Sequence, residues 1–359
     1  MVTLLDCIRR IPALLEGILK NREENTHSFF EYLSDKINEI NEIIFIGSGT
    51  SNTSAITSKI FVEKVTGIGT KVCYPADFCY NTGYYNPKAL YIFTSQTGTS
   101  IVTRKAQKLV QDMGFLSLSI TESGETPLAR EASSHINMGC GHEEYLMRTI
   151  GYSSSVFTHM ILALEIGLRR GAISASQYSE YLAQAALVPE SHRAVTENTL
   201  EWLKKSKRQM MRSQCIIFTG AGALYGVALE GAVKVWEIPQ ITSMGYELEE
   251  GMHGPNYGYD IRHCVIVLND GGREDKKALS LAAYMKEVWN NGLVAGSSVM
   301  DKNDLEIELR GGEFGCLELS AVPQVIAYQL AVDGGRELLM HPDDSRMEKY
   351  FITHKKDEE

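Results

Sequence analysis

The chain has 359 residues, of which 44% are hydrophobic and 22% are charged, and its formal net charge is -10. These values are typical of a globular protein with two or three core units. They argue against nucleic acid as a partner, because the sequence has no basic stripe to contact phosphates. No apolar run approaches the roughly 20 residues that span a bilayer, so we expect no membrane partner.

The N-terminal residues 1–25 place charges inside an apolar pattern, which predicts an amphipathic helix and not a signal peptide. Seven cysteines are scattered along the chain without a Cys-x-x-Cys pair. We therefore expect reduced thiols and a cytoplasmic location. The segment His142-Glu143-Glu144 lacks the second histidine of a zinc-protease motif, so we expect no metal.

Two segments of the chain repeat one pattern at a constant offset. IIFIGSGTSNTSAITSKIFVEKV (43–65) and IIFTGAGALYGVALEGAVKVWEI (216–238) each have a strand-like run, then Gly-x-Gly, then a helix. A second pair of strands ending in Gly turns follows, at residues 89–100 and 263–272. This repeat predicts an α/β fold of two tandem domains with parallel sheets. We expect a helical segment over 1–30, domains over 31–175 and 200–340, and a tail over 341–359.

The two repeats differ in the residues that follow their strands. The first repeat has hydroxyl-rich turns, with Ser48, Thr50 and Ser51 in one turn and Ser95, Gln96, Thr97 and Ser100 in the other. Helix N-termini at the carboxyl ends of parallel strands attract anions, and hydroxyls add donors, so these turns predict a phosphate monoester site. The alternative is that the hydroxyls only cap helices. No dinucleotide fingerprint or Walker motif is present, and we expect no cofactor.

A second group of polar residues lies in the second repeat. Glu230, Lys234 and Glu237 are spaced at i, i+4 and i+7, so they share one helix face among small and apolar neighbours. His253 follows in a loop between glycine and proline. Two carboxylates, an amine and an imidazole are the groups that move protons on a small substrate. The alternatives are a surface Glu–Lys pair and a loop histidine bonded to backbone.

Four motifs together resemble the SIS (sugar isomerase) family. They are GSGTS (47–51), SQTGTS (95–100), EGAVKVWE (230–237) and HGP (253–255). The resemblance is strongest to the fructosamine-6-phosphate deglycases and to the isomerase half of glucosamine-6-phosphate synthase. It implies two SIS domains per chain, each a parallel five-stranded sheet flanked by helices, and a homodimer or higher oligomer.

The resemblance also implies roles for single residues. The hydroxyl turns would hold the sugar phosphate, and Glu237 would move a proton between C1 and C2. His253 would open the sugar ring, acting from the neighbouring subunit, while Glu230 and Lys234 would orient the open-chain substrate. Lys349 would correspond to a tail lysine of the synthases that forms a Schiff base, although it lies one residue closer to the preceding arginine.

The expected function is therefore cleavage of a fructosamine 6-phosphate to glucose 6-phosphate and a free amine. The alternatives are an aminosugar-6-phosphate deaminase, a ketose–aldose isomerase, and a non-catalytic sugar-phosphate sensor. The sequence begins at the helix before the isomerase half, so we do not expect glutamine-dependent amination. The segment 143–155 is a candidate for selectivity toward the amine.

Overall fold

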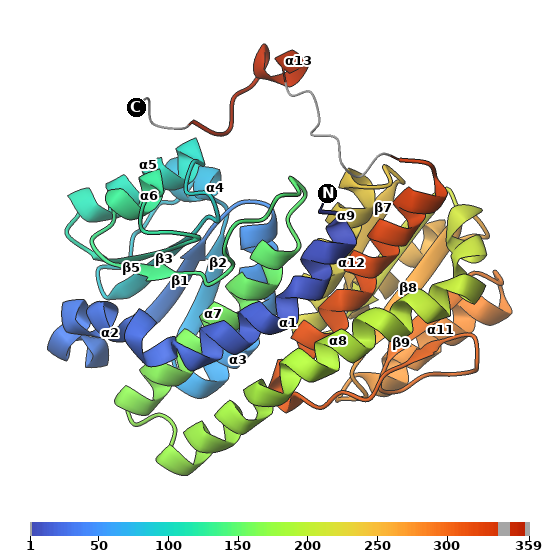
Figure 1. Cartoon of the computed structure of the whole chain (residues 1–359), viewed down its shortest axis with the longest axis horizontal. Coiled ribbons are helices and arrows are strands. Elements are labelled where there is room, and N and C mark those ends of the chain that lie inside the picture. The colour runs from blue at the N-terminus through green and yellow to red at the C-terminus, as the bar shows by residue number, and fades with distance from the viewer. Residues whose placement is uncertain (1, 337–344, 356–359) are drawn as a thin grey trace. The chain divides into compact units, whose positions relative to one another are not determined.

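The computed structural model describes residues 2–336 and 345–355 (Figure 1). Two compact units account for the chain. Unit 1 comprises Met1–Ala13, Glu144–Thr149 and Leu182–Met340, and unit 2 comprises Leu14–Glu143, Ile150–Tyr181 and His341–Glu359. The long helix α8 begins in unit 2 and ends in unit 1.

Helices and strands alternate along most of the chain. The elements up to the start of α8 are α1 (Leu4–Lys20), α2 (Arg22–Leu33), η1 (Ser34–Asn38), β1 (Glu42–Ile46), α3 (Thr50–Thr66), β2 (Gly69–Cys73), α4 (Pro75–Tyr80), β3 (Ala89–Thr94), α5 (Ile101–Asp112), β4 (Leu116–Thr121), α6 (Pro127–Arg130), β5 (His135–Asn137) and α7 (Ile150–Arg169). The later elements are α8 (Ala175–Met211), β6 (Cys215–Gly220), α9 (Ala223–Glu237), β7 (Ser243–Glu247), α10 (Leu248–Met252), η2 (Pro255–Gly258), β8 (His263–Asn269), α11 (Asp275–Glu287), β9 (Gly292–Gly296), β10 (Leu305–Glu306), η3 (Gly312–Phe314), α12 (Gly315–Asp333) and α13 (Ser345–Glu348).

The sheet of unit 2 has five parallel strands in the order β2-β1-β3-β4-β5. The chain passes from β1 to β2 on one side and then to β3 on the other. Ile46, the last residue of β1, is in register with Cys73 of β2 and with Phe93 of β3. The ends of β1 and β3 therefore lie side by side at the point where the strand order reverses, which is where open α/β sheets bind ligands.

The sheet of unit 1 repeats this topology. Its five parallel strands run in the order β10-β9-β8-β6-β7, so β6 takes the place of β1 and β8 that of β3. Gly49 precedes α3 with φ 55° and ψ -127°, and Gly222 precedes α9 with φ 58° and ψ -125°. Only glycine adopts this backbone conformation readily, so the Gly-x-Gly of each repeat makes the same turn. The predicted tandem α/β fold is confirmed.

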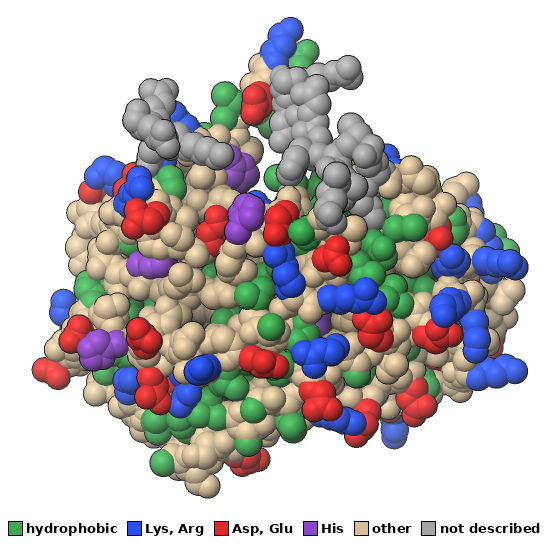
Figure 2. Space-filling view, in the orientation of Figure 1, with side chains coloured by type: hydrophobic (Ala, Val, Ile, Leu, Met, Phe, Trp, Pro, Cys, Tyr) green, Lys and Arg blue, Asp and Glu red, His purple; other side chains and the backbone are tan. Residues whose placement is uncertain are grey.

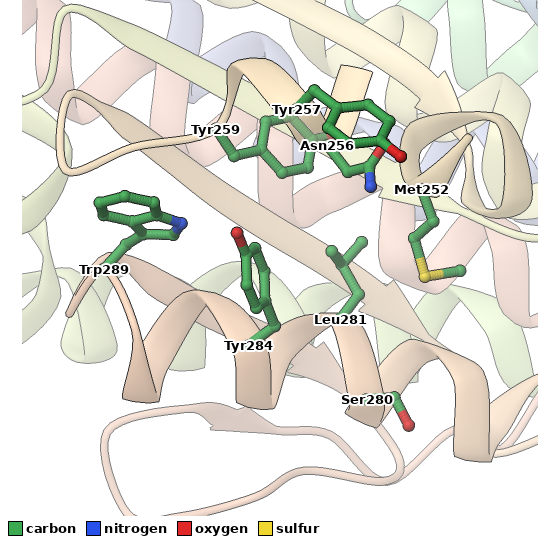
Figure 3. A pocket seen from close by; sticks show the side chains of 8 residues that line it. All are labelled: Met252, Asn256, Tyr257, Tyr259, Ser280, Leu281, Tyr284 and Trp289. Atoms are coloured by element: carbon green, nitrogen blue, oxygen red, sulfur yellow. The ribbon is translucent and has the colours of Figure 1, made fainter. Parts of the chain in front are cut away.

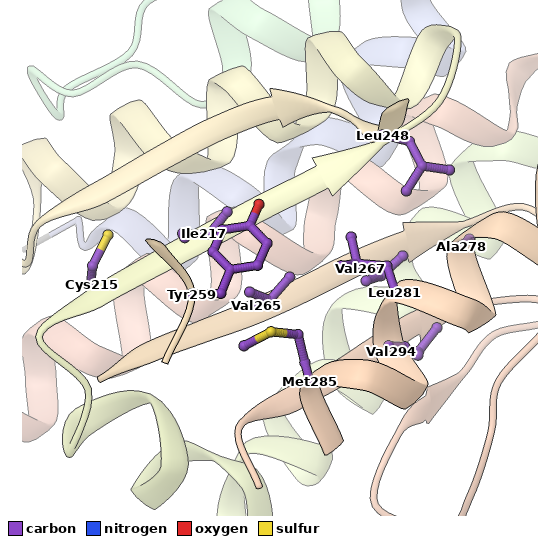
Figure 4. Packing of buried hydrophobic residues seen from close by; sticks show 11 residues of the cluster. Cys215, Ile217, Leu248, Tyr259, Val265, Val267, Ala278, Leu281, Met285 and Val294 are labelled. Carbon is purple, nitrogen blue, oxygen red and sulfur yellow. The ribbon is translucent and has the colours of Figure 1, made fainter. Parts of the chain in front are cut away.

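Each sheet packs its buried strands against helices. In unit 1, Val265 and Val267 of β8 contact a cluster that includes Leu281 and Met285 of α11 (Figure 4). In unit 2, the equivalent cluster contains Phe93 of β3, next to the hydroxyl turns. Full burial of such a side chain contributes about 1.5–3 kcal/mol, so these cores hold the strand ends firmly.

Two helices, one amphipathic and one strongly apolar, concern the predictions about the N-terminus and about membrane spans. The predicted N-terminal amphipathic helix is α1, which buries Leu4, Ile8, Ile11 and Leu15. The segment Gly312–Asp333, which includes α12, is long and apolar enough to cross a bilayer, but 83% of its most apolar window is buried inside the structure. That burial is what a central core helix has. On the face in Figure 2, Lys and Arg side chains are interspersed with Asp and Glu.

Candidate functional site

The first hydroxyl turn connects β1 to α3 in unit 2. The amide of Ser51 donates to the carbonyl of Ser48 at 3.1 Å, and the amide of Asn52 donates to Gly49 at 2.9 Å. These bonds close the first turn of the helix around the glycine. Within the described part of the chain, the hydroxyls of Ser48 and Ser51 have no hydrogen-bond partner. Both remain available to a ligand at the N-terminus of α3.

The second hydroxyl turn connects β3 to α5. The Ser95 amide donates to the carbonyl of Ile120 at 3.1 Å, and the Gly98 amide donates to the carbonyl of Ser95 at 3.2 Å. The hydroxyls of Thr97 and Thr99 are 2.8 Å apart, and Thr103 donates to the Ser100 hydroxyl at 2.9 Å. Among residues 2–336 and 345–355, the Ser95 hydroxyl has no hydrogen-bond partner.

The structure therefore brings the two predicted turns to the ends of neighbouring strands. Their backbone amides belong to the first turns of α3 and α5, where the helix dipoles favour negative charge. The N-cap of α3 is Gly49, which has no side chain, and the N-cap of α5 is Ser100, whose hydroxyl makes no capping hydrogen bond. The alternative that these hydroxyls serve only as helix caps is not what the structure has.

Gln96 is held against the start of α7. Its Nε2 lies 3.5 Å from Glu143 Oε2, and Glu143 also accepts from the amides of Ile150 at 3.0 Å and Gly151 at 3.2 Å. A Cβ at Gly151 would lie 1.9 Å from Gln96 Oε1, so only glycine leaves room for this side chain. Glu143, in the segment suggested for selectivity, thus caps α7 and contacts the second turn.

The C-terminal tail runs beside the second turn. The Ile101 amide donates to the carbonyl of Thr353 at 3.1 Å, and the Lys355 amide donates to the carbonyl of Thr99 at 2.9 Å. These bonds form a short antiparallel bridge at Ser100. Lys349 is exposed, with its Nζ 5.7 Å from the centre of the Tyr350 ring.

The charged face of α9 is in unit 1. The side chains of Glu230 and Lys234 are each 1% exposed, whereas that of Glu237 is 39% exposed. Lys234 Nζ lies 2.8 Å from Glu237 Oε2 and 3.5 Å from Glu230 Oε1. The surface-pair alternative is therefore wrong for Glu230 and Lys234. A buried cation lies between an inner and an outer carboxylate, and the outer one reaches solvent.

Glu237 faces a cavity of about 400 Å³. Trp236, Gln240 and Thr242 line it together with Glu237. The Trp236 side chain is more than half exposed, and Gln240 has φ 59°. A positive φ at a residue other than glycine costs free energy and is concentrated at functional sites. The cavity gives a small molecule access to the outer carboxylate.

His253 is exposed at the end of α10. Its amide donates to the carbonyl of Glu250 at 3.1 Å, while the Glu247 carboxylate accepts from the amides at the start of α10. Beyond the histidine, Asn256 Oδ1 accepts from the Gly254 amide at 2.9 Å. Hydrogen bonds to backbone amides on either side of His253 along the chain thus hold the loop, while the imidazole stays exposed.

A second cavity, of about 440 Å³, lies beside this loop (Figure 3). Eight side chains line it: Met252, Asn256, Tyr257, Tyr259, Ser280, Leu281, Tyr284 and Trp289. The Tyr259 hydroxyl donates to the carbonyl of Gly251 at 2.8 Å, and burial raises the pKa of that phenol. Among the described residues, no hydrogen bond or ion pair joins His253 to Glu237.

Comparison with known proteins supports this organisation. Residues 36–165 match the SIS domain model. This chain carries an SIS domain. The matched SIS segment includes both hydroxyl turns, Glu143 and most of α7, and the sheet of unit 1 repeats the topology of the SIS sheet.

This chain has relatives among curated proteins and among proteins of solved structure. It is 28% identical over 253 residues to a glutamine–fructose-6-phosphate aminotransferase (isomerizing) of Gloeobacter violaceus, covering 70% of this chain and 42% of that one. The chain spans about half the length of the curated relatives it matches.

Two solved structures share the fold. A Clostridium difficile 630 protein has a TM-score of 0.89 and 23% identity, covering 99% of this chain and 100% of its own. Glucosamine-6-phosphate deaminase of Thermotoga maritima has a TM-score of 0.71 and 21% identity, covering 90% and 97%.

One polar residue behind the SIS turns lies outside every motif of the sequence. His159 lies on α7, is fully buried, and has hydroxyls at both ring nitrogens. Its signal in the sequence is a lone imidazole within the mostly apolar segment 156–164.

Proposed function

We propose that this chain is an enzyme that moves a proton between C1 and C2 of a sugar phosphate. One observation carries the proposal: Lys234 is buried between Glu230 and Glu237, and Glu237, the more exposed of these two carboxylates, lines a cavity. A carboxylate held by a fixed ammonium and accessible to a ligand is suited to act as a general base. The hydroxyls of Ser48, Ser51 and Ser95, in the turns of unit 2, are the groups that we propose bind a phosphate.

The substrate that we propose is a fructosamine 6-phosphate, a ketose that carries an amine on C1. In this proposal Ser48, Ser51 and Ser95 bind the phosphate group of the substrate. Glu237 takes a proton from C1, the C2 carbonyl oxygen becomes an enolate, and that oxygen takes a proton from solvent to give the enol. Lys234 lies 2.8 Å from that carboxylate and stabilises negative charge that develops nearby.

Return of the proton to C2 produces an imine between C1 and the amine nitrogen. Water adds to C1, and the C–N bond breaks to release glucose 6-phosphate and the free amine. His253 opens the sugar ring before these steps by protonating the ring oxygen. We propose that it acts on the substrate of a second copy of the chain, because its imidazole is exposed at the surface.

A second candidate is an aminosugar-6-phosphate deaminase or a ketose–aldose isomerase, which share the proton transfer at C1 and C2. The deaminase candidate is supported by the fold of the Thermotoga maritima protein. The cavity beside Glu237 favours the first candidate, since about 400 Å³ with an exposed Trp236 leaves room for a group on C1.

The test is to incubate the protein with a panel of fructosamine 6-phosphates, glucosamine 6-phosphate and fructose 6-phosphate. Glucose 6-phosphate, fructose 6-phosphate and ammonia are then measured. Glucose 6-phosphate with a free amine supports the first candidate, and ammonia with fructose 6-phosphate supports the second. Sugar-phosphate binding with no product from any substrate would contradict an enzyme and indicate a sensor.

A further inference from the structure

His159 occupies a central position behind the two SIS turns. Its ring lies 4.6 Å from the ring of Phe45 in β1, measured between centres. Its Nδ1 is 3.2 Å from the hydroxyl of Ser58 in α3, and its Nε2 is 2.9 Å from the hydroxyl of Thr94 in β3. One imidazole on α7 therefore contacts the strand and helix that flank the first turn and the strand that leads into the second.

The hydrogen bonds define the state of this ring. The Ser58 hydroxyl also lies 3.2 Å from the carbonyl of Ala55 and can donate its only proton there. Ser58 then accepts from the Nδ1–H of His159, which leaves Nε2 as an acceptor for the Thr94 hydroxyl. Burial lowers the pKa of His159 to about 3, so the neutral ring that this pattern needs is present at neutral pH.

We propose that His159 is a positioning residue that sets the spacing between the two phosphate-holding turns, an inference that rests on the proposed function. Thr94 directly precedes Ser95, and Ser58 is on the helix that begins beside Ser51. A phosphate monoester bound by both turns needs their donors at one fixed separation. The two hydroxyl–imidazole bonds tie that separation to a single rigid side chain.

A core histidine that only stabilises unit 2 would give a different result from a positioning residue. The chain offers a matched control for this distinction. Thr57 and Tyr152 join their hydroxyls at 2.7 Å, so they also link α3 to α7 through a buried hydrogen bond. That bond does not involve β3, and losing it should weaken the packing of the same two helices without moving the second turn.

The experiment measures the affinity of the full chain for glucose 6-phosphate and for inorganic phosphate by calorimetry, together with KM and kcat on the active substrate. His159→Phe removes both hydrogen bonds of the imidazole. Thr94→Val removes only the hydrogen bond to β3, and it serves as the test variant if His159→Phe does not fold. Loss of one such bond should weaken affinity and raise KM about tenfold, with a smaller change in kcat. Thr94→Ser keeps the hydroxyl and should restore the wild-type affinity.

Tyr152→Phe provides the control and should keep the wild-type affinity. Unchanged affinity in Thr94→Val, or an equal loss in Tyr152→Phe, would overturn the positioning role while leaving the proposed function intact. Failure of the wild-type chain to bind either phosphate ligand would overturn the proposed phosphate site itself and the inference with it.

Discussion

Lys234 Nζ lies 2.8 Å from Glu237 Oε2, although the lysine side chain is 1% exposed and that of Glu237 is 39% exposed. The ammonium is thus buried directly beneath a carboxylate that reaches a cavity. On its inner side it faces Glu230, which is as buried as the lysine. This stack of three charges connects the core of α9 to the position where we propose that the reaction occurs.

The stack predicts a large cost for removing the cation alone. Lys234→Met should lower the free energy of unfolding by about 3–5 kcal/mol, because Glu230 loses its buried ammonium neighbour. The double variant Glu230→Gln/Lys234→Met removes both buried charges and should recover part of that loss. Urea denaturation of the three proteins measures the effect, and equal stability of Lys234→Met and wild type would contradict it.

Gly151 predicts a second, more local effect. Gly151→Ala places a methyl group where Gln96 Oε1 now lies, so the glutamine must leave its place against Glu143. We expect a higher KM for the sugar phosphate with little change in Tm. Gly17→Ala is the control, because nothing lies within 4 Å of that position in α1 and alanine is the better helix former. A Gly151→Ala enzyme with the wild-type KM would remove Gln96 from the site.

Replacing His253 should affect ring-closed and acyclic substrates differently. The imidazole is exposed, so His253→Ala should leave Tm nearly unchanged. Turnover of ring-closed substrates should fall, while turnover of acyclic analogues should be largely kept. The comparison of kcat on the two kinds of substrate checks this, and equal losses on both would exclude a role in ring opening.

Two buried histidines predict how stability depends on pH. Burial lowers the pKa of His159 to about 3 and that of His192 to about 4, from the usual 6.5. At pH values between these lowered pKa values and 6.5, the unfolded chain binds more protons than the folded chain. The free energy of unfolding should therefore fall as the pH drops below about 6.5. The slope should approach roughly 1.4 kcal/mol per pH unit for each histidine.

His192→Phe isolates one of these contributions. Both ring nitrogens of His192 are buried without a hydrogen-bond partner among the described residues, so phenylalanine removes the titration without removing a hydrogen bond of the ring to them. Denaturation at pH 7 and pH 5.5 should then show a smaller difference than in wild type. The same difference in both proteins would mean that folding does not lower the pKa of His192.

Much of this architecture could be predicted from the sequence, because the repeat is encoded in local patterns. Buried strands, Gly-x-Gly turns and amphipathic helices specify the two sheets, and Gly49 and Gly222 even share one backbone conformation. The spacing of Glu230, Lys234 and Glu237 predicted a shared helix face, and the structure joins all three.

The contacts that could not be predicted connect distant segments. His159 meets Ser58 and Thr94, and Gln96 meets Glu143 and Gly151, through packing of α7 that no local period encodes. The depth of Lys234 is also a tertiary property, since helical spacing orders charges on a face without stating how far that face is buried. The position of the tail beside Ser100 is of the same kind.

The most direct test of the central claim follows the proton itself. The wild-type chain and Glu237→Gln are incubated with the active fructosamine 6-phosphate in D₂O, and deuterium at C2 of the glucose 6-phosphate product is measured by NMR. Glu237 reaches solvent through the cavity, so its carboxyl proton exchanges with D₂O before it is delivered to C2. The account therefore predicts deuterium at C2 with wild type, and a rate about 10²–10⁴-fold lower with Glu237→Gln, the usual effect of losing a general base. Unimpaired deuterium incorporation by a Glu237→Gln protein that still binds the sugar phosphate would contradict it.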